Sequence, residues 1–327
     1  MNLLISFHQY LKNQPNSSLL TNQESTALKG LLILLVVLGH NTYLMVDMFA
    51  YKFLYAFHVY AFFYLPFLYN HKEETISHCV VKNILRLYVP YTFVFVLLLG
   101  IYLKTNSAFN IGNIFFAYVT GNPNYFLKMG GFLWFIPTLF SLLVIKQFYY
   151  RGNLVCRYLL LVLSFFCLVC FSFGYLGSWQ IYQPFRCMTA FAMLFPAVIS
   201  RFFIRQNRIK FIDLCFFFFV IIAFIIYPGN HFFAYTILNR FILPIVIFLF
   251  LYNQRINLGR FKFFQRIGRY SFPIYVFHIF IYQCCYWLLG NYMGGGTLCW
   301  GILAFVFTFI VSYFIAKAKA VRFLFPH

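Results

Sequence analysis

Two ionisable residues interrupt one apolar run near the start of the chain. The stretch "ALKGLLILLVVLGHN", residues 27–41, holds Lys29 and, eleven positions later, His40. In a helix at about 100° per residue, the two side chains share one face and lie about 16 Å apart along the axis. A histidine at membrane depth either faces a functional cavity or is a hydrogen-bonded structural residue. A lysine at the end of such a run either sets topology by snorkelling or binds an anion.

Further polar residues lie at similar depth in other apolar runs. His58 lies in "YKFLYAFHVYAFFYLPFLYN" and reaches the depth of His40 from the adjacent run, while Asn41 adds an amide beside His40. His278 follows Ser271 in "GRYSFPIYVFHIFIY" by about 10 Å of helix. An ionisable residue at membrane depth usually faces a cavity or a partner, so these residues are candidates for a functional site.

Two arginines lie within the expected apolar runs, Arg186 in "QPFRCMTAF" and Arg240 in "LNRFILPIV". A buried arginine normally pairs with an acid or lines a polar cavity. The chain has only five acids, all near the ends of the runs: Glu24, Asp47, Glu73, Glu74 and Asp213. This shortage predicts an anionic or strongly polar ligand for the two arginines.

Metal and disulfide chemistry are not predicted. A pair such as His40 and His58 offers too few ligands for a transition metal, and carboxylates are missing nearby. The pair could hold a haem, which an absorbance band would reveal. Cys167 and Cys170 have metal-like spacing, but they lie inside an apolar run and are interpreted as packing residues.

The elements that must position these residues are membrane helices. The 327 residues are 63% hydrophobic and only 9% charged, and their mean hydropathy is +0.81. We therefore expect an all-α, polytopic membrane protein, since runs such as "LCFFFFVIIAFIIY" do not alternate as barrel strands would. About ten transmembrane helices are predicted, at 28–46, 51–70, 81–103, 132–150, 154–174, 183–203, 211–228, 232–252, 271–290 and 298–317.

Charge sets the orientation of these helices. With the N-terminus inside, 20 of the 25 Lys and Arg residues fall in cytoplasmic segments, so both termini are predicted to be cytoplasmic. Because the basic residues separate apolar runs, the net charge of +20 does not indicate nucleic-acid binding. We expect a single transmembrane domain over 1–327, with a cytoplasmic segment at 1–26, no fused soluble domain and a short interfacial helix in the 104–131 loop.

The ordered motifs resemble the acyltransferase 3 family of integral membrane O-acyltransferases, and most closely its sugar O-acetylase branch. Two places depart from the family pattern. Pro66 and Phe67 stand where the family has Ser-Gly, and Asn83 stands where a basic residue precedes Arg86 by three positions. The matching residues are Lys29 and His40; His58 before Phe62 and Phe63; Lys82 and Arg86 before Pro90 and Tyr91; Leu133, Trp134 and Phe135; and Ser271, Tyr275 and His278.

The resemblance implies transfer of an acyl group, most often acetyl, from cytoplasmic acetyl-CoA or another acyl-CoA to a sugar hydroxyl. It implies a multi-pass protein of the cytoplasmic (inner) membrane that uses no metal and acts on a polysaccharide or lipid-linked glycan. His40 is the expected general base, with His58 and His278 as further catalytic residues. Lys29, Lys82 and Arg86 are expected to bind the donor's phosphates. The expected acceptor-binding residues are Asn41, Trp134, Arg186, Arg240, Ser271 and Tyr275.

A different class of protein remains open at this point. A transporter or flippase for lipid-linked saccharides would also need about ten helices, buried arginines and a polar cavity. It would not explain why a lysine and a histidine share one helix face, and no inverted repeat is visible in the sequence.

Overall fold

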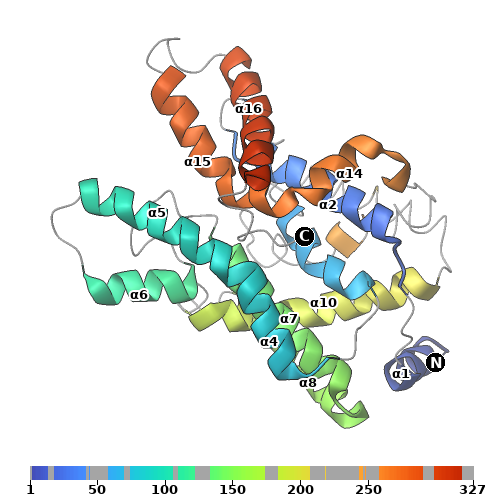
Figure 1. Cartoon of the computed structure of the whole chain (residues 1–327). Coiled ribbons are helices and arrows are strands. Elements are labelled where there is room, and N and C mark those ends of the chain that lie inside the picture. Colours follow the sequence, from blue (N-terminus) through green and yellow to red (C-terminus); the bar gives the residue numbers. More distant parts are fainter. Residues whose placement is uncertain are drawn as a thin grey trace. The chain divides into compact units, whose positions relative to one another are not determined.

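The computed structural model describes residues 2–13, 18–41, 44, 58–69, 74–105, 110–121, 133–173, 183–206, 218, 243–245, 247, 258–289 and 298–318. Every regular element in these ranges is helical, which confirms the all-α class for this part of the chain (Figure 1). The predicted runs 211–228 and 232–252, and Arg240 with them, lie almost wholly outside the described residues.

Most helices follow the predicted runs. They are α1 (Asn2–Asn13), α2 (Asn22–Gly39), η1 (Leu65–Leu68), α4 (Ile76–Asn83), η2 (Ile84–Tyr88), α5 (Val89–Thr105), α6 (Ile111–Thr120), α7 (Phe135–Arg151), α8 (Leu154–Ser172), η5 (Pro184–Arg186), α10 (Cys187–Gln206), η7 (Leu258–Arg260), α14 (Lys262–Arg269), α15 (Ser271–Leu289) and α16 (Leu298–Lys317).

Three elements differ from the prediction or sharpen it. The helix predicted over 28–46 begins earlier, at Asn22, and ends at Gly39, so His40 stands at its end and not in its interior. The short helix expected in the 104–131 loop is confirmed as α6, whose first turn is capped by the side chain of Asn110. Helices α1 and α14 were not predicted, because neither is apolar enough to be recognised as a membrane span.

Four helices of the described residues are long and apolar enough to cross a membrane. They cover Ile76–Lys104, Leu154–Phe171, Pro184–Arg205 and Cys299–Lys317, and shorter apolar helices cover His58–Leu68, Ile111–Thr120 and Ser271–Cys285. A multi-pass membrane protein is therefore supported. The count of ten spans and the sides of the two termini stay predictions.

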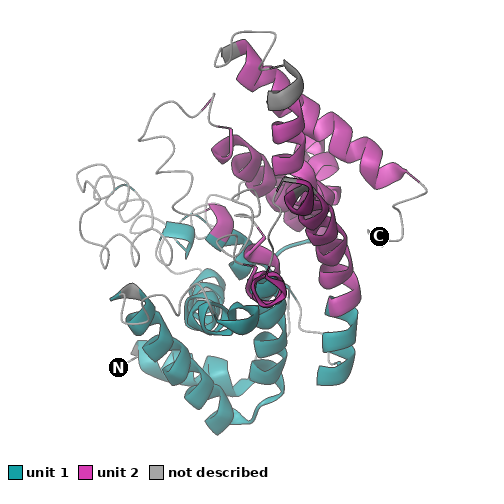
Figure 2. Ribbon diagram, turned by 90° about the vertical axis from the view of Figure 1, so that its left-hand side faces the viewer, with its two compact units in different colours: residues 1–21, 60–83, 137–257 teal, residues 22–59, 84–136, 258–327 magenta. Residues whose placement is uncertain are grey.

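The chain divides into two compact units, each assembled from three separate segments (Figure 2). Unit 1 comprises 1–21, 60–83 and 137–257, and contains α1, α4, α8, α10 and most of α7. Unit 2 comprises 22–59, 84–136 and 258–327, and contains α2, α5, α6, α14, α15 and α16. Unit 2 therefore holds most of the residues that the sequence motifs single out.

Within unit 2, α2 and α14 touch through their backbones (Figure 1). A Cβ atom added to Gly30 would lie 2.0 Å from the carbonyl oxygen of Phe264, and one added to Gly268 would lie 1.7 Å from that of Thr26. Any side chain at either position would push the helices apart. The two glycines thus fix the separation of α2 and α14.

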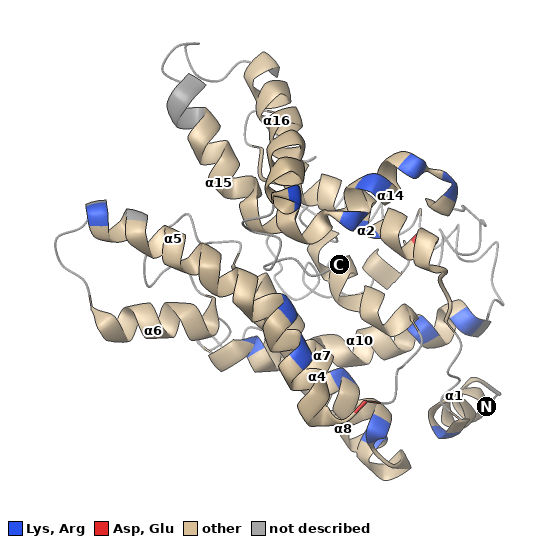
Figure 3. Ribbon diagram, viewed as in Figure 1, with Lys and Arg blue, Asp and Glu red and all other residues tan. Residues whose placement is uncertain are grey.

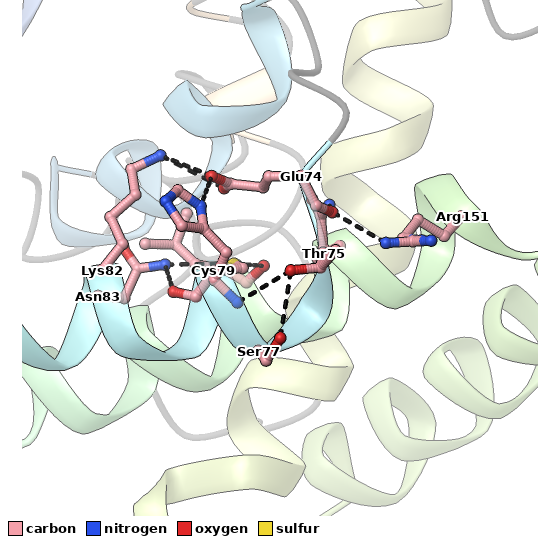
Figure 4. Close-up of polar contacts among 10 residues, drawn as sticks. Glu74, Thr75, Ser77, Cys79, Lys82, Asn83 and Arg151 are labelled. Atoms are coloured by element: carbon pink, nitrogen blue, oxygen red, sulfur yellow. Dashed lines mark hydrogen bonds and ion pairs between the residues drawn. The ribbon is translucent and has the colours of Figure 1, made fainter.

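Within unit 1, the start of α4 is held by a small polar network (Figure 4). The Thr75 hydroxyl accepts the backbone N–H of His78 at 3.2 Å, which caps the helix. The Glu74 carboxylate accepts hydrogen bonds from Lys82 at 3.1 Å and from His78 at 3.0 Å. Arg151 of α7 donates to the Glu74 carbonyl at 3.2 Å, so the network joins α4 to α7.

Burial and neighbouring charges shift the pKa of Glu74 in opposite directions. Burial raises the pKa of this carboxyl, but the hydrogen bonds and charges of Lys82 and His78 outweigh burial, and the pKa lies below its usual value of 4.5. A lowered pKa means that the folded state binds the proton more weakly than the unfolded state does. The stabilisation is therefore complete above the unfolded pKa and is lost as pH falls through the folded pKa.

The α2–α14 contact predicts that alanine is not tolerated at either glycine. Gly30→Ala and Gly268→Ala should each destabilise the protein by about 1–3 kcal/mol, because overpacking forces the helices apart. Thermal unfolding of the purified protein measures this. Gly100→Ala in α5 is the control, since its new Cβ meets nothing within 4 Å and should stabilise the helix by about 0.5–1 kcal/mol. Equal effects at the three glycines would contradict the close contact.

The Glu74 network predicts a pH-dependent stability. Glu74→Gln should lower the unfolding midpoint at neutral pH, by a free energy of roughly 1 kcal/mol or less for an ion pair this exposed. The difference from wild type should vanish as pH falls through the folded-state pKa of Glu74, which lies below 4.5, because the carboxyl is then protonated in both states. Unfolding curves recorded across this pH range test the effect, and Glu24→Gln at the start of α2 controls for loss of a carboxylate elsewhere. A difference that persists at low pH would show that the charge is not the cause.

Candidate active site

Two histidines from opposite ends of the sequence meet inside unit 2. His40 follows the end of α2, and His278 lies in the middle of α15. Their rings are 4.8 Å apart between centroids and meet edge to face at 71°. His278 is 0% exposed, while His40 is half-buried. A histidine that reacts with a substrate must be partly accessible, as His40 is. The buried His278 ring packs against the ring of His40.

Backbone carbonyls orient both imidazole rings. Nδ1 of His40 lies 2.8 Å from the carbonyl oxygen of Val36, and Nδ1 of His278 lies 2.6 Å from that of Tyr275. A carbonyl can only accept, so Nδ1 carries the proton in each neutral ring and Nε2 carries the lone pair. The sequence offered no acid to orient His40, and the carbonyl one helical turn earlier takes that role.

Aromatic motif residues surround the pair. The ring of Tyr275 lies 5.8 Å from that of His278 and 4.9 Å from that of Phe135. His58 is also 0% exposed and lies within electrostatic range of His278. Residues of four sequence motifs thus lie together in unit 2. They are His40, His58, Phe135, and Tyr275 with His278.

Asn41 ties the end of α2 to the C-terminal helix pair. Its side-chain amide donates to the carbonyl of Gly301 in α16 at 2.8 Å and to the hydroxyl of Tyr282 in α15 at 3.4 Å. The Tyr282 hydroxyl in turn donates to the carbonyl of Val37 at 2.9 Å. The geometry of Asn41 is that of a structural bridge holding its neighbour His40; its predicted contact with an acceptor stays a prediction.

The predicted phosphate-binding residues divide between the two units. Lys29 of α2 and Arg86 of η2 both belong to unit 2 and lie within electrostatic range of each other. Lys82 belongs to unit 1, where it forms the ion pair with Glu74. The residues around Arg86 form a π-helix, a wider turn that often marks functional sites. Pro90 accounts for this turn, because it has no N–H to donate to the carbonyl of Arg86 four residues earlier.

Trp134 and Ser271 lie at the ends of helices in unit 2. Gly121 ends α6 in the left-handed conformation, with φ at 62°, and a Cβ there would lie 2.8 Å from the Cα of Trp134. Tyr91 of the Pro-Tyr motif donates to the carbonyl of Tyr118 at 2.5 Å, which holds α6 against α5. Ser271 is the first residue of α15, as predicted.

Arg186 lies in unit 1, in a strained turn. It is 8% exposed, and it and Phe185 have positive φ values of 52° and 50°, which side-chain-bearing residues rarely adopt. The Gln183 side chain accepts the backbone N–H of Thr189 at 3.0 Å, and Ser141 donates to the Phe185 carbonyl at 2.7 Å. These contacts hold the turn that buries the guanidinium.

Sequence reasoning missed two cations of unit 1, the buried Arg201 and the half-buried Lys146, because it assigned both to topology. Arg201 is 2% exposed and donates to the carbonyls of Phe67 and Tyr69, the latter at 2.8 Å. Lys146 donates to the carbonyl of Pro66 at 2.6 Å. Both hold the turn at the end of η1, where the chain departs from the family's Ser-Gly. Their position inside the predicted apolar runs 132–150 and 183–203 was the available signal.

Comparison with known families now decides the class of the protein. The acyltransferase 3 model, described as an acyltransferase domain, matches residues 22–317. The chain belongs to the acyltransferase 3 family. No curated protein and no solved structure matches it. As a family member with membrane-spanning helices it is a membrane acyltransferase, and nothing supports the transporter alternative.

The hydrogen bonds of Asn41 predict that substituting this residue lowers the stability of the acyltransferase. Asn41→Leu should destabilise by about 0.5–1.5 kcal/mol for each hydrogen bond that it removes, one to the Gly301 carbonyl and one to the Tyr282 hydroxyl. Tyr282→Phe should cost about 0.5–1.5 kcal/mol through the bond to Val37. Thermal unfolding tests both. Tyr158→Phe, which removes a bond to exposed His8 at 2.8 Å, is the control and should have a smaller effect. If Asn41→Leu matches the control, the bridge does not bear on stability.

Proposed function

We propose that this acyltransferase moves an acyl group, foremost acetyl, from acyl-CoA to a sugar hydroxyl, with His40 as the general base. The contact between His40 and His278 carries the proposal. It brings together a half-buried imidazole and a fully buried one, from motifs more than two hundred residues apart, in the unit that also holds Lys29.

The proposed step is a direct transfer. Nε2 of His40 takes the proton of the acceptor hydroxyl while the oxygen attacks the thioester carbonyl carbon. The carbon–sulfur bond then breaks, and the CoA thiolate leaves with the proton returned from His40. The Val36 carbonyl supports this role because it favours the tautomer with the lone pair on Nε2. His278 would pack against the His40 ring and keep it in place, and His58 would stabilise the oxyanion.

The donor is proposed to bind along α2. Its phosphates would lie against Lys29 and Arg86, and its arm would extend toward His40. Lys82, four residues before Arg86, is the third proposed phosphate contact. The helix rise supports this arrangement, since the 11 residues from Lys29 to His40 correspond to about 16 Å. The hydrogen bond from the His40 backbone N–H to Val36 at 3.1 Å shows that the helical pattern continues to His40, so the spacing holds.

The acceptor is proposed to be a polysaccharide or a lipid-linked glycan of the cell envelope, modified at the cytoplasmic membrane. Trp134, Ser271 and Tyr275 of unit 2 would line its path, and the predicted contact of Arg186 and Arg240 with polar or anionic groups is a separate proposal for unit 1. Burial of Arg186 in a held turn supports this role, because a rigid guanidinium binds oxyanions with two parallel hydrogen bonds.

The base assignment is tested by replacing His40. His40→Ala should reduce label transfer from acetyl-CoA to a glycan panel by about 10²–10⁴-fold, the usual contribution of a general base. The assay uses the purified full-length protein with labelled acetyl-CoA and measures both transfer and donor hydrolysis. His8→Ala, outside residues 22–317, is the matched control and should be as active as wild type. Full activity of His40→Ala would refute the proposal.

The phosphate role of Lys29 is tested by kinetics. Lys29→Met should raise the KM for the donor by roughly 10–100-fold and leave kcat nearly unchanged, because a lost charge-assisted hydrogen bond weakens binding by about 1.5–3 kcal/mol. Lys12→Met removes one cytoplasmic charge elsewhere and should leave both constants unchanged. A fall in kcat alone would contradict the anchor role.

A further inference from the structure

Helix α14 has two opposite faces. Phe264 and Gly268 face α2, and Gly268 contacts the carbonyl of Thr26 there. Lys262, Arg266 and Arg269 fall within about 60° of one another on roughly the other side of the helix. All three are exposed, as is Arg260 just before the helix. Figure 3 shows these basic residues gathered on α14. We call Arg260, Lys262, Arg266 and Arg269 the basic stripe.

Two phenylalanines beside the basic stripe are also exposed. Phe261 is 53% exposed and Phe263 is 63% exposed, at the start of α14. Large apolar side chains next to cations on a short helix are typical of helices that lie in the plane of a membrane surface. At eight residues, α14 is too short to cross a bilayer.

The neighbours of α14 place it at the boundary of the apolar region. One residue after its end, α15 begins and runs into the apolar segment Ser271–Cys285. On its other side it contacts α2 at Thr26 and Gly30, where the apolar run of α2 begins. Two independent helices therefore start their apolar stretch at the level of α14.

Protein acids do not account for the basic stripe. In the described part of unit 2 the one acidic residue is Glu24, against four cations in the stripe alone. Within the described residues, the ion pairs are those of Glu74 with His78 and Lys82, both in unit 1. An excess of exposed cations at a membrane boundary fits the phosphates of anionic lipids.

We propose that α14 is an interfacial helix that binds the head groups of anionic phospholipids in the cytoplasmic leaflet. The basic stripe would contact lipid phosphates while Phe261 and Phe263 insert among the acyl chains. Through Gly30 and Gly268, the lipid-bound helix would hold α2 and the start of α15 at a fixed depth. This inference concerns lipid binding and does not depend on the acyl transfer proposed above.

Lipid titration of the detergent-purified full-length protein, followed by native mass spectrometry, tests the proposal. Wild type should bind phosphatidylglycerol much more tightly than phosphatidylcholine. A variant with Lys262→Gln, Arg266→Gln and Arg269→Gln should lose roughly a hundredfold in affinity for phosphatidylglycerol, from about 1 kcal/mol per cation. Its affinity for phosphatidylcholine should not change.

A matched variant separates a specific site from general charge. Lys12→Gln, Arg205→Gln and Lys317→Gln remove three exposed cations from α1, α10 and α16, and should keep most of the lipid preference. An equal loss in both triple variants would overturn the proposal, and so would a wild type without preference. Wild type in high salt gives the same test without any substitution, since its preference should fall steeply.

Acyl-CoA binding distinguishes lipid phosphate from donor phosphate. The affinity for CoA should be the same in the stripe variant and in wild type. A variant that binds phosphatidylglycerol as wild type does, but binds CoA more weakly, would assign the stripe to the donor and overturn the lipid proposal.

Discussion

The backbone contact between Gly30 and Gly268 is the constraint on which the rest of unit 2 depends. His40 follows Gly30 by ten residues, and His278 follows Gly268 by ten residues. The two segments touch at the glycines and again at the histidines, where the rings are 4.8 Å apart. Equal spacing means that α2 runs alongside α14 and α15 in the same direction. The glycines fix the two segments at one end. Because each histidine follows its glycine by the same number of residues, His40 and His278 meet at the other end.

Backbone carbonyls take the place of acids throughout this protein. With 25 Lys and Arg residues against 5 acids, most cations have no carboxylate to pair with. Arg157 donates to the carbonyl of Leu11 at 2.7 Å, and Lys146 to that of Pro66 at 2.6 Å. The histidines use the same partners, since Val36 and Tyr275 orient His40 and His278. A carbonyl is a fixed dipole that carries no proton of its own, so the tautomer of each histidine is set by helix geometry.

Composition and periodicity predicted the helical class, the positions of the long apolar helices and the short helix α6, because apolar length is written directly in the sequence. They missed α1 and α14, whose mixed faces resemble polar loops until a neighbour is known. They placed His40 inside a helix that in fact ends at Gly39. Motif order indicated which residues belong together, but the contact of His40 with His278 depends on two glycines whose role no local pattern reveals.

The buried arginines Arg186 and Arg201 show when a shortage of acids indicates an anionic ligand and when it does not. Arg201 is more buried than Arg186, yet it donates to two carbonyls at the end of η1. A buried arginine without a nearby acid therefore does not by itself require an anionic ligand, because main-chain oxygens can meet its needs. What separates Arg186 from Arg201 is the backbone. Two consecutive residues in the left-handed region cost about 1–3 kcal/mol each, and this cost has to be offset elsewhere. Arg201 sits in the regular helix α10 and needs no such explanation. The case for a ligand at Arg186 rests on this strained turn.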